Sequence, residues 1–126
     1  MKSPKLIVFD LDNTLWTPEL YQLRQQRSQR PIAGQHIDLF PGAREILNRK
    51  QRNELDHVSF AIASRTKSVD WAHDLLDQFK IRSLFDFIEI FPGDKDKHFV
   101  NLARDSTFEF HDMVFFDDAR DGRYGN

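Results

Sequence analysis

Apolar residues along the chain come in short runs that are separated by longer amphipathic segments. Residues 5–9 (KLIVF) and residues 58–63 (VSFAIA) form continuous runs that contain β-branched side chains. Runs of this kind are typical of strands that are buried on both faces of a sheet. Residues 113–116 (MVFF) predict the last strand, and the alternating pattern of residues 85–91 (FDFIEIF) predicts a strand nearer a sheet edge.

Three segments between these strands repeat apolar residues at helical spacing. Pro41 and Gly42 begin a predicted helix that ends near Asn53, Ser68 can cap a second helix, and residues 94–104 form a third. Residues 18–40 are polar, weakly helical at first and then a predicted loop. The apolar faces expected from this spacing are Ala43, Ile46 and Leu47 in the first helix, Val69, Ala72, Leu75, Leu76 and Phe79 in the second, and Phe99, Leu102 and Ala103 in the third.

Strands and helices therefore alternate, and no internal repeat is visible. Alternation of this kind predicts an α/β fold in which a parallel sheet is covered by helices and joined by right-handed crossovers. A chain of 126 residues has the length of one ordinary domain. We expect residues 1–126 to form a single domain.

Composition narrows the choice of partners. The formal net charge is −2, which does not create the positive field that broad binding to nucleic acid or to a membrane surface requires. The absence of cysteine excludes disulfides, thiolate zinc sites and cysteine nucleophiles. No apolar run is long enough for a signal-peptide core or a membrane span. We expect a cytoplasmic protein that binds neither nucleic acid nor membrane.

Reactive side chains follow each predicted strand at once. In a parallel sheet the carboxyl ends of the strands meet at one rim, where ligands bind. We expect this rim to gather Asp10, Asp12 and Thr14 after the first strand, Ser64, Arg65 and Thr66 after the second, Lys95 after the third, and Asp117 and Asp118 after the fourth.

The chemistry of this set favours a hard cation and a phosphoryl group. Carboxylates with a hydroxyl and an ammonium group suit Mg²⁺, because that ion prefers oxygen ligands and often bridges to phosphate. The five histidines are scattered without metal-ligand spacing, so we interpret them as surface or packing residues.

The segment from Asp10 to Thr14 (DLDNT) resembles the DxDxT nucleophile motif of the haloacid dehalogenase superfamily of phosphotransferases. Ser64, Lys95 and the acidic pair at 117–118 follow in the order of the other three superfamily motifs. The strings DLDNTLW, ASRT, FPGDKxxHF and FFDD are most similar to the eukaryotic-type magnesium-dependent phosphatases. The likeness covers nearly the whole chain, and it implies a three-layer Rossmann-like core with a mostly parallel sheet and no cap domain.

The resemblance also implies a role for each acidic residue. Asp10 would attack the phosphoryl group and form an aspartyl-phosphate. Asp12 would protonate the leaving group and then take a proton from the attacking water, while its backbone carbonyl binds Mg²⁺. Asp118 would complete the metal ligands, with Asp117 supporting the loop.

The remaining motif residues would bind the phosphoryl group. Ser64 would donate a hydrogen bond to a phosphoryl oxygen, and Lys95 would neutralise charge on the phosphate and on Asp10. Arg65 would help to hold the substrate. The reaction implied is the magnesium-dependent hydrolysis of phosphate monoesters, either phosphotyrosine-type side chains of proteins or sugar phosphates.

Several alternatives stay open at this stage. A DxDxT string can be a simple turn that caps the backbone. A calcium-binding loop is excluded, because Leu15 stands where that loop needs glycine and Tyr21 where it needs glutamate. The series Arg24, Arg27 and Arg30 is either a solvated face or a contact to an anionic substrate. A receiver-like phosphoaspartate signalling module and a truncated, inactive interaction domain are the rival functions.

Two features bear on the substrate and on assembly. Neither the interval from Trp16 to Phe40 nor the interval from Ser64 to Lys95 has room for a cap domain, so we expect an open rim that admits a phosphoprotein or a small phosphorylated molecule. Relatives have an asparagine, a strand and a helix after the acidic pair, whereas this sequence ends at Asn126. The expectation is a truncated carboxyl-terminal part, with Asp121 or Asn126 as substitute support and with an exposed sheet edge that invites a dimer.

Overall fold

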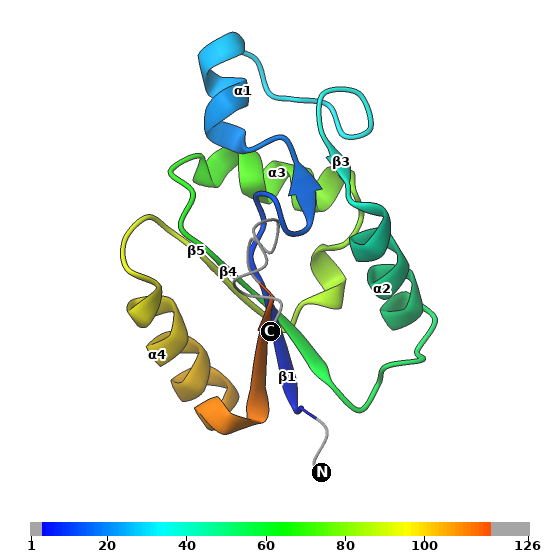
Figure 1. Ribbon diagram of the computed structural model, residues 1–126, viewed down its shortest axis with the longest axis vertical. Helices are drawn as coiled ribbons and strands as arrows, with labels where there is room; N and C mark the ends of the chain where they lie inside the picture. The colour runs from blue at the N-terminus through cyan, green and yellow to red at the C-terminus, as the bar shows by residue number, and fades with distance from the viewer. Residues whose placement is uncertain (1–3, 117–126) are drawn as a thin grey trace.

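Four parallel strands form the centre of the computed structural model, which describes residues 4–116 (Figure 1). In chain order they are β1 (Leu6–Phe9), β4 (Ser59–Ser64), β5 (Phe87–Ile90) and β6 (Met113–Phe116). In space the order is β5-β4-β1-β6, so β1 is paired on both sides. The predicted parallel sheet is confirmed, and so is the edge position of the alternating strand β5.

The two faces of the sheet bury different side chains. Val8 is the register partner of Ala61, and Phe9 is the register partner of Ile62. Because successive side chains of a strand point to opposite faces, Val8 and Ala61 share one face and Phe9 and Ile62 share the other. All four are at most 3% exposed, which explains why β1 and β4 lack a polar face in the sequence.

Helices cover both faces and complete three layers. On the Phe9 face, α2 (Pro41–Gln51) and α3 (Val69–Gln78) pack into one apolar cluster with the sheet. On the Val8 face, α4 (Lys95–Ser106) contributes the fully buried Leu102 to a second cluster. The three-layer α/β fold expected from the sequence is therefore confirmed.

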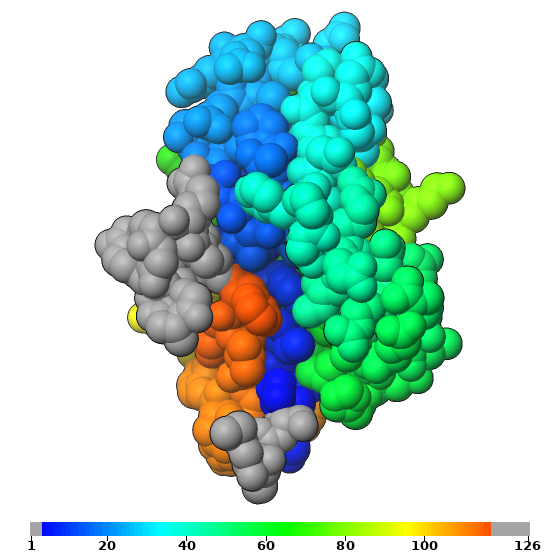
Figure 2. Space-filling view, turned by 45° about the vertical axis from the view of Figure 1, so that its right-hand side comes forward, coloured from blue at the N-terminus to red at the C-terminus, as the bar shows by residue number. Residues whose placement is uncertain are grey.

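Residues 16–39 form a small layer of their own at one end of the molecule (Figures 1 and 2). They contain β2 (Trp16–Thr17), α1 (Leu20–Gln26) and β3 (Asp38–Leu39), with β2 and β3 paired antiparallel. Trp16 and Leu20 are fully buried in the same cluster as α3. The expected single helix or long loop is thus one short helix held by a two-stranded ribbon, and no cap domain is present among the described residues.

The arginine series attaches this layer to α3. The Arg24 Nε donates a hydrogen bond to the Ser68 Oγ at 3.1 Å, and the guanidinium lies 3.9 Å from the centre of the Trp71 ring. Arg30 forms an ion pair of 3.1 Å with Asp74. These contacts show a structural role for Arg24 and Arg30. Ser68 is the N-cap residue of α3, as predicted, but its hydroxyl accepts from Arg24 and makes no capping hydrogen bond to the helix.

Two short 3-10 turns, η1 (Arg82–Leu84) and η2 (Phe110–Asp112), lead into β5 and β6. In Figure 2, β6 lies in orange beside β1 in dark blue at the surface. Its Phe115 and Phe116 are 36% and 45% exposed, so the last strand is less buried than its apolar sequence predicts. Within residues 4–116 no helix has the length and apolar character needed to cross a bilayer.

Leu102 and Val100 lie on the same helix but differ in burial, at 0% and 57% exposed. We expect Leu102→Ala to lower the free energy of unfolding by about 2–5 kcal/mol, because it removes apolar contacts beneath β1 and β4 and leaves a cavity. Val100→Ala, the matched control, should change it by no more than about 0.5 kcal/mol. Urea unfolding followed by circular dichroism measures both values. Equal effects of the two substitutions would contradict the packing of α4 described above.

Candidate active site

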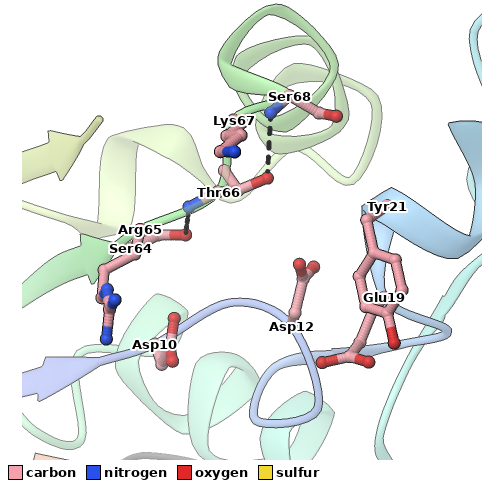
Figure 3. Close-up of a pocket in the computed structure, with 9 residues that line it drawn as sticks. All are labelled: Asp10, Asp12, Glu19, Tyr21, Ser64, Arg65, Thr66, Lys67 and Ser68. Atoms are coloured by element: carbon pink, nitrogen blue, oxygen red, sulfur yellow. Dashed lines mark hydrogen bonds between the residues drawn. The ribbon is translucent and has the colours of Figure 1, made fainter. Parts of the chain in front are cut away.

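A pocket of about 390 Å³ opens at the carboxyl ends of β1 and β4. Figure 3 shows Asp10 and Asp12 on the loop after β1, facing the segment that follows β4, with Glu19 and Tyr21 on a further side. The pocket therefore lies at the rim expected for a parallel sheet. Its lining consists of Asp10, Asp12, Glu19, Tyr21, Ser64, Arg65, Thr66, Lys67 and Ser68.

The loop after β1 turns tightly enough to bring both carboxylates to the pocket. Asn13 has a φ of 62°, in the left-handed region that asparagine tolerates better than most residues. The Leu15 amide donates to the Leu11 carbonyl at 2.9 Å, and the Asn13 amide donates to the Trp16 carbonyl at 2.8 Å. These bonds hold the backbone of the loop, so the side chains of Asp10 and Asp12 are not needed to close the turn.

Asp10 lies at the meeting point of three elements. Its Oδ1 accepts a hydrogen bond of 2.7 Å from the Leu11 amide, and its Oδ2 is 3.5 Å from the Lys95 Nζ at the start of α4. Its own amide donates to the Phe116 carbonyl at 2.9 Å, where β6 ends. The side chains of Asp10 and Lys95 are 19% and 18% exposed, so this ion pair is screened by water far less than a surface pair.

Asp12 is held in a different environment from Asp10. Its Oδ1 accepts a hydrogen bond of 2.8 Å from the indole Nε1 of the buried Trp16. Burial raises the pKa of Asp12 above its ordinary value, the hydrogen bonds from Trp16 and from the Leu20 backbone oppose this rise, and the nearby charge of Glu19 adds to it. Asp10 faces the Lys95 ammonium instead, so the two carboxylates of this loop have different surroundings.

Ser64 ends β4 and begins the opposite wall of the pocket. Its Oγ accepts from the Thr66 amide at 3.3 Å, and the Thr66 Oγ1 accepts from the Ser68 amide at 3.1 Å (Figure 3). A hydroxyl that accepts such a bond can still donate its own hydrogen to a phosphoryl oxygen. Ser64 is 2% exposed, so its position depends on the backbone at the end of β4.

The turn between β5 and α4 brings Lys95 to Asp10. Gly93 has a φ of 125°, a conformation that residues with a Cβ rarely adopt. Asp94 is the N-cap residue, and Lys95 is the first residue of α4. The ammonium group thus enters the site from a fixed helix end.

The structure brings together most of the residues predicted at this rim, Thr66 included, but Thr14 lines a separate cavity beside Phe9 and Gly42. Asp10, Asp12, Ser64 and Arg65 line one pocket, and Lys95 contacts Asp10 from beside it. The predicted metal ligand Asp118 and its neighbour Asp117, together with Asp121 and Asn126, lie outside the described residues.

Four residues that line the pocket were not predicted from the sequence: Glu19, Tyr21, Lys67 and Ser68. Glu19 and Tyr21 come from the start of α1, and only the packing of that layer against α3 brings them to the pocket. Lys67 and Ser68 could have been found, because they follow the β4 motif directly.

A second group of possible metal ligands lies at the other end of β6. Glu109, His111 and Asp112 offer ligand atoms within 4.8 Å of one another. They surround η2, which precedes β6, so they are at the amino end of the sheet and not at the pocket. Ion pairs of His111 with both acids account for the cluster without a metal.

Comparison with known proteins agrees with this geometry. A family model described as Acid Phosphatase matches residues 2–124. Magnesium-dependent phosphatase 1 of Homo sapiens is 37% identical over 126 residues, which cover 94% of this chain and 70% of that protein. A HAD-like hydrolase superfamily protein of Schizosaccharomyces pombe is 28% identical over 141 residues, which cover 98% and 80%.

A solved structure supports the fold alone. The crystal structure of a candidate phosphatase from Clostridium difficile superposes with a TM-score of 0.64 over 91% of this chain and 76% of its own, at 14% identity. The family model spans every motif of the pocket, from the strand before Asp10 to the acidic pair after β6. The chain is therefore a phosphatase of the acid phosphatase family, within the haloacid dehalogenase-like hydrolases.

Proposed function

We propose that this chain hydrolyses phosphate monoesters with the help of Mg²⁺, through an aspartyl-phosphate formed on Asp10. The observation that carries the proposal is the joint position of Asp10, Asp12 and Ser64 on one pocket, with the Lys95 ammonium 3.5 Å from the Asp10 carboxylate. We take residues 1–126 as one catalytic core, because the motifs of the pocket come from both halves of the chain.

The oxygen donors of the pocket fit Mg²⁺. Two carboxylates lie on one wall, and the sequence offers no thiolate, so the donor set is that of a hard cation. We propose Asp10, the Asp12 backbone carbonyl and Asp118 as ligands. The support for Asp118 is its place in the chain. The Phe116 carbonyl accepts a hydrogen bond from the Asp10 amide, and Asp118 follows Phe116 by two residues. Because two residues span at most about 7 Å, Asp118 stays close to Asp10 along the chain. When bound, Mg²⁺ supplies positive charge that lowers the repulsion between a carboxylate and a phosphate.

Asp10 is the proposed nucleophile. One carboxylate oxygen forms a bond to phosphorus, the bond from phosphorus to the leaving oxygen breaks, and Asp12 gives that oxygen a proton. In the second step Asp12 takes a proton from water, the water oxygen bonds to phosphorus, and the bond to the Asp10 oxygen breaks. Inorganic phosphate is released, and both residues return to their first state.

Ser64 and Lys95 stabilise the charge that moves during these steps. The Ser64 hydroxyl donates a hydrogen bond to a phosphoryl oxygen. The Lys95 ammonium lies beside the Asp10 carboxylate, which receives the phosphoryl group and then gives it up to water. Arg65, on the same wall of the pocket, is placed to hold the rest of an anionic substrate.

The open pocket supports the proposal of a substrate from either expected class. No cap closes it within the described residues, and its outer wall carries the exposed Tyr21 together with Glu19 and Lys67. A phosphotyrosine-type side chain of a protein and a sugar phosphate both present their phosphate at the end of a short stem. A cytoplasmic location and the oligomeric state stay predictions of the sequence.

Asp10→Asn removes the nucleophile but keeps the shape of the side chain. We expect Mg²⁺-dependent release of phosphate from p-nitrophenyl phosphate to fall by about 10³-fold or more. Asp105→Asn, on the exposed end of α4 beside Arg104, is the matched control and should keep the wild-type rate. Turnover by the Asp10 variant at the wild-type rate would refute the aspartyl-phosphate mechanism, and a wild type without turnover would favour the inactive interaction domain.

Asp12→Asn tests the acid. p-Nitrophenolate is a stable leaving group that needs no proton, whereas the alkoxide of an alkyl phosphate must be protonated as it leaves. The rate of the phosphorylation step should therefore fall by about 10²–10⁴-fold for the alkyl substrate and much less for the aryl one. Single-turnover rates with both substrates isolate this step. Equal losses for the two leaving groups would show that Asp12 acts only on the metal or the fold.

Asp118→Asn tests the metal site. If Asp118 is a ligand, the Mg²⁺ concentration for half-maximal activity should rise by about tenfold or more. Glu109→Gln disrupts the other acidic cluster, at η2, and should leave that concentration unchanged. The reverse pattern would move the metal to the amino end of the sheet and would contradict the proposed site.

A further inference from the structure

His98 is the one histidine that is fully buried among the described residues, at 0% exposed. It lies in the first turns of α4, three residues after Lys95. A polar side chain with no access to water must find its partners inside the protein, since an unpaired buried group costs about 1–3 kcal/mol. The partners of His98 therefore show which segments of the chain the ring connects.

The ring joins the ends of two neighbouring strands. Its Nε2 lies 2.9 Å from the Ser64 carbonyl, at the end of β4, and 2.9 Å from the Phe91 carbonyl, just after β5. Because carbonyl oxygens only accept hydrogen bonds, the Nε2–H group is the donor that these two oxygens share. The Phe91 amide also donates to the Ser64 carbonyl at 3.1 Å, so the ring sits where both strands end.

The same ring fixes the beginning of α4. Its Nδ1 lies 3.1 Å from the carbonyl of the N-cap residue Asp94, a contact that is a hydrogen bond only when Nδ1 carries the hydrogen. Its plane stacks on Phe91 at 3.8 Å between ring centres and 9° between planes. Lys95 follows Gly93 and Asp94 in this turn and reaches Asp10, so the direction of its side chain depends on how the turn is held.

We propose that His98 is a positioning residue of the phosphatase reaction, which ties the end of β4 to the start of α4 and so holds Lys95 at Asp10 and Ser64 at the phosphate. This inference rests on the proposed function of Asp10, Ser64 and Lys95. Two groups that bind the same phosphoryl group from different elements need a fixed separation, and a displacement of about 1 Å can lower the rate by about 10²-fold. The His98 ring contacts both the end of β4 and the N-cap residue of α4.

Three substitutions separate the bonds of the ring from its volume. His98→Gln places an amide nitrogen near the Nε2 position and can donate to the strand carbonyls. His98→Asn places its amide nitrogen near the Nδ1 position, where that nitrogen reaches only the carbonyl of Asp94, the N-cap residue of the same helix. His98→Phe keeps the stacked ring but donates to neither. His111→Asn, on the exposed η2 turn, is the control for histidine loss.

We expect His98→Asn and His98→Phe to lower kcat by about 10²-fold and His98→Gln to retain most of it, since only the glutamine keeps the bond between β4 and α4. The Mg²⁺ concentration for half-maximal activity should stay at the wild-type value in all three, because the proposed metal ligands lie outside α4. If His98→Phe does not fold, the comparison of His98→Gln with His98→Asn still decides. Equal rates for these two folded variants would overturn the proposal.

A double-mutant cycle distinguishes positioning from general stability. In the wild-type background, His98→Asn should lower kcat by about 10²-fold. If His98 acts through Lys95, the same substitution in the Lys95→Ala background should lower kcat by less than about threefold. Fully additive losses would show that His98 does not act through Lys95 and would overturn the proposal.

Binding of inorganic phosphate, measured by calorimetry in the presence of Mg²⁺, provides a test that needs no turnover. His98→Asn should weaken it by about tenfold, and His98→Gln should not. A wild type that binds phosphate but does not release it from an ester would refute the proposed function and leave this comparison valid. Unchanged phosphate affinity in His98→Asn would overturn the role of His98 itself.

Discussion

The pairing of β1 with a parallel strand on each side is the interaction on which the site depends. Because β4 and β5 run in the same direction as β1, the residues that follow these three strands, among them Asp10, Ser64 and Lys95, are brought to one rim. The hydrogen bond from the Asp10 amide to the Phe116 carbonyl continues the pairing of β1 with β6 to the residue that follows β1. The sheet thus supplies a rigid frame that holds the Asp10 carboxylate 3.5 Å from the Lys95 ammonium.

The two carboxylates of the loop after β1 have different surroundings. Asp10 faces the Lys95 ammonium at 3.5 Å. Asp12 is buried, accepts the Trp16 indole hydrogen bond and feels the charge of Glu19, and burial raises its pKa. Trp16 is thus both a core residue of this layer and a hydrogen-bond donor to Asp12. The layer of residues 16–39 therefore shapes the chemistry of Asp12, although it lies outside the three-layer core.

Much of this could be predicted from one sequence. Residues 113–116 form the strand expected there, and the other strands and the three long helices end within three residues of their expected limits. Buried strands and amphipathic helices leave clear patterns because their side chains face a core with a fixed period. In residues 16–39 a weak helix was predicted, but the ribbon of β2 and β3 was not, because two-residue strands leave no periodic pattern. Trp71 shows the same limit: it is 3% exposed in α3 because Arg24 covers its ring, a contact between positions 47 residues apart.

The sequence by itself determined the chemistry of the site, since the order and spacing of Asp10, Asp12, Ser64 and Lys95 are local motifs that each follow a strand. It also determined the parallel fold that makes those motifs meet. Only the tertiary structure decided which other residues share the pocket, such as Glu19 and Tyr21, and what a buried histidine such as His98 contacts. The reason is physical: a motif is written along the chain, whereas burial, pKa and hydrogen-bond partners depend on which distant segments pack against it.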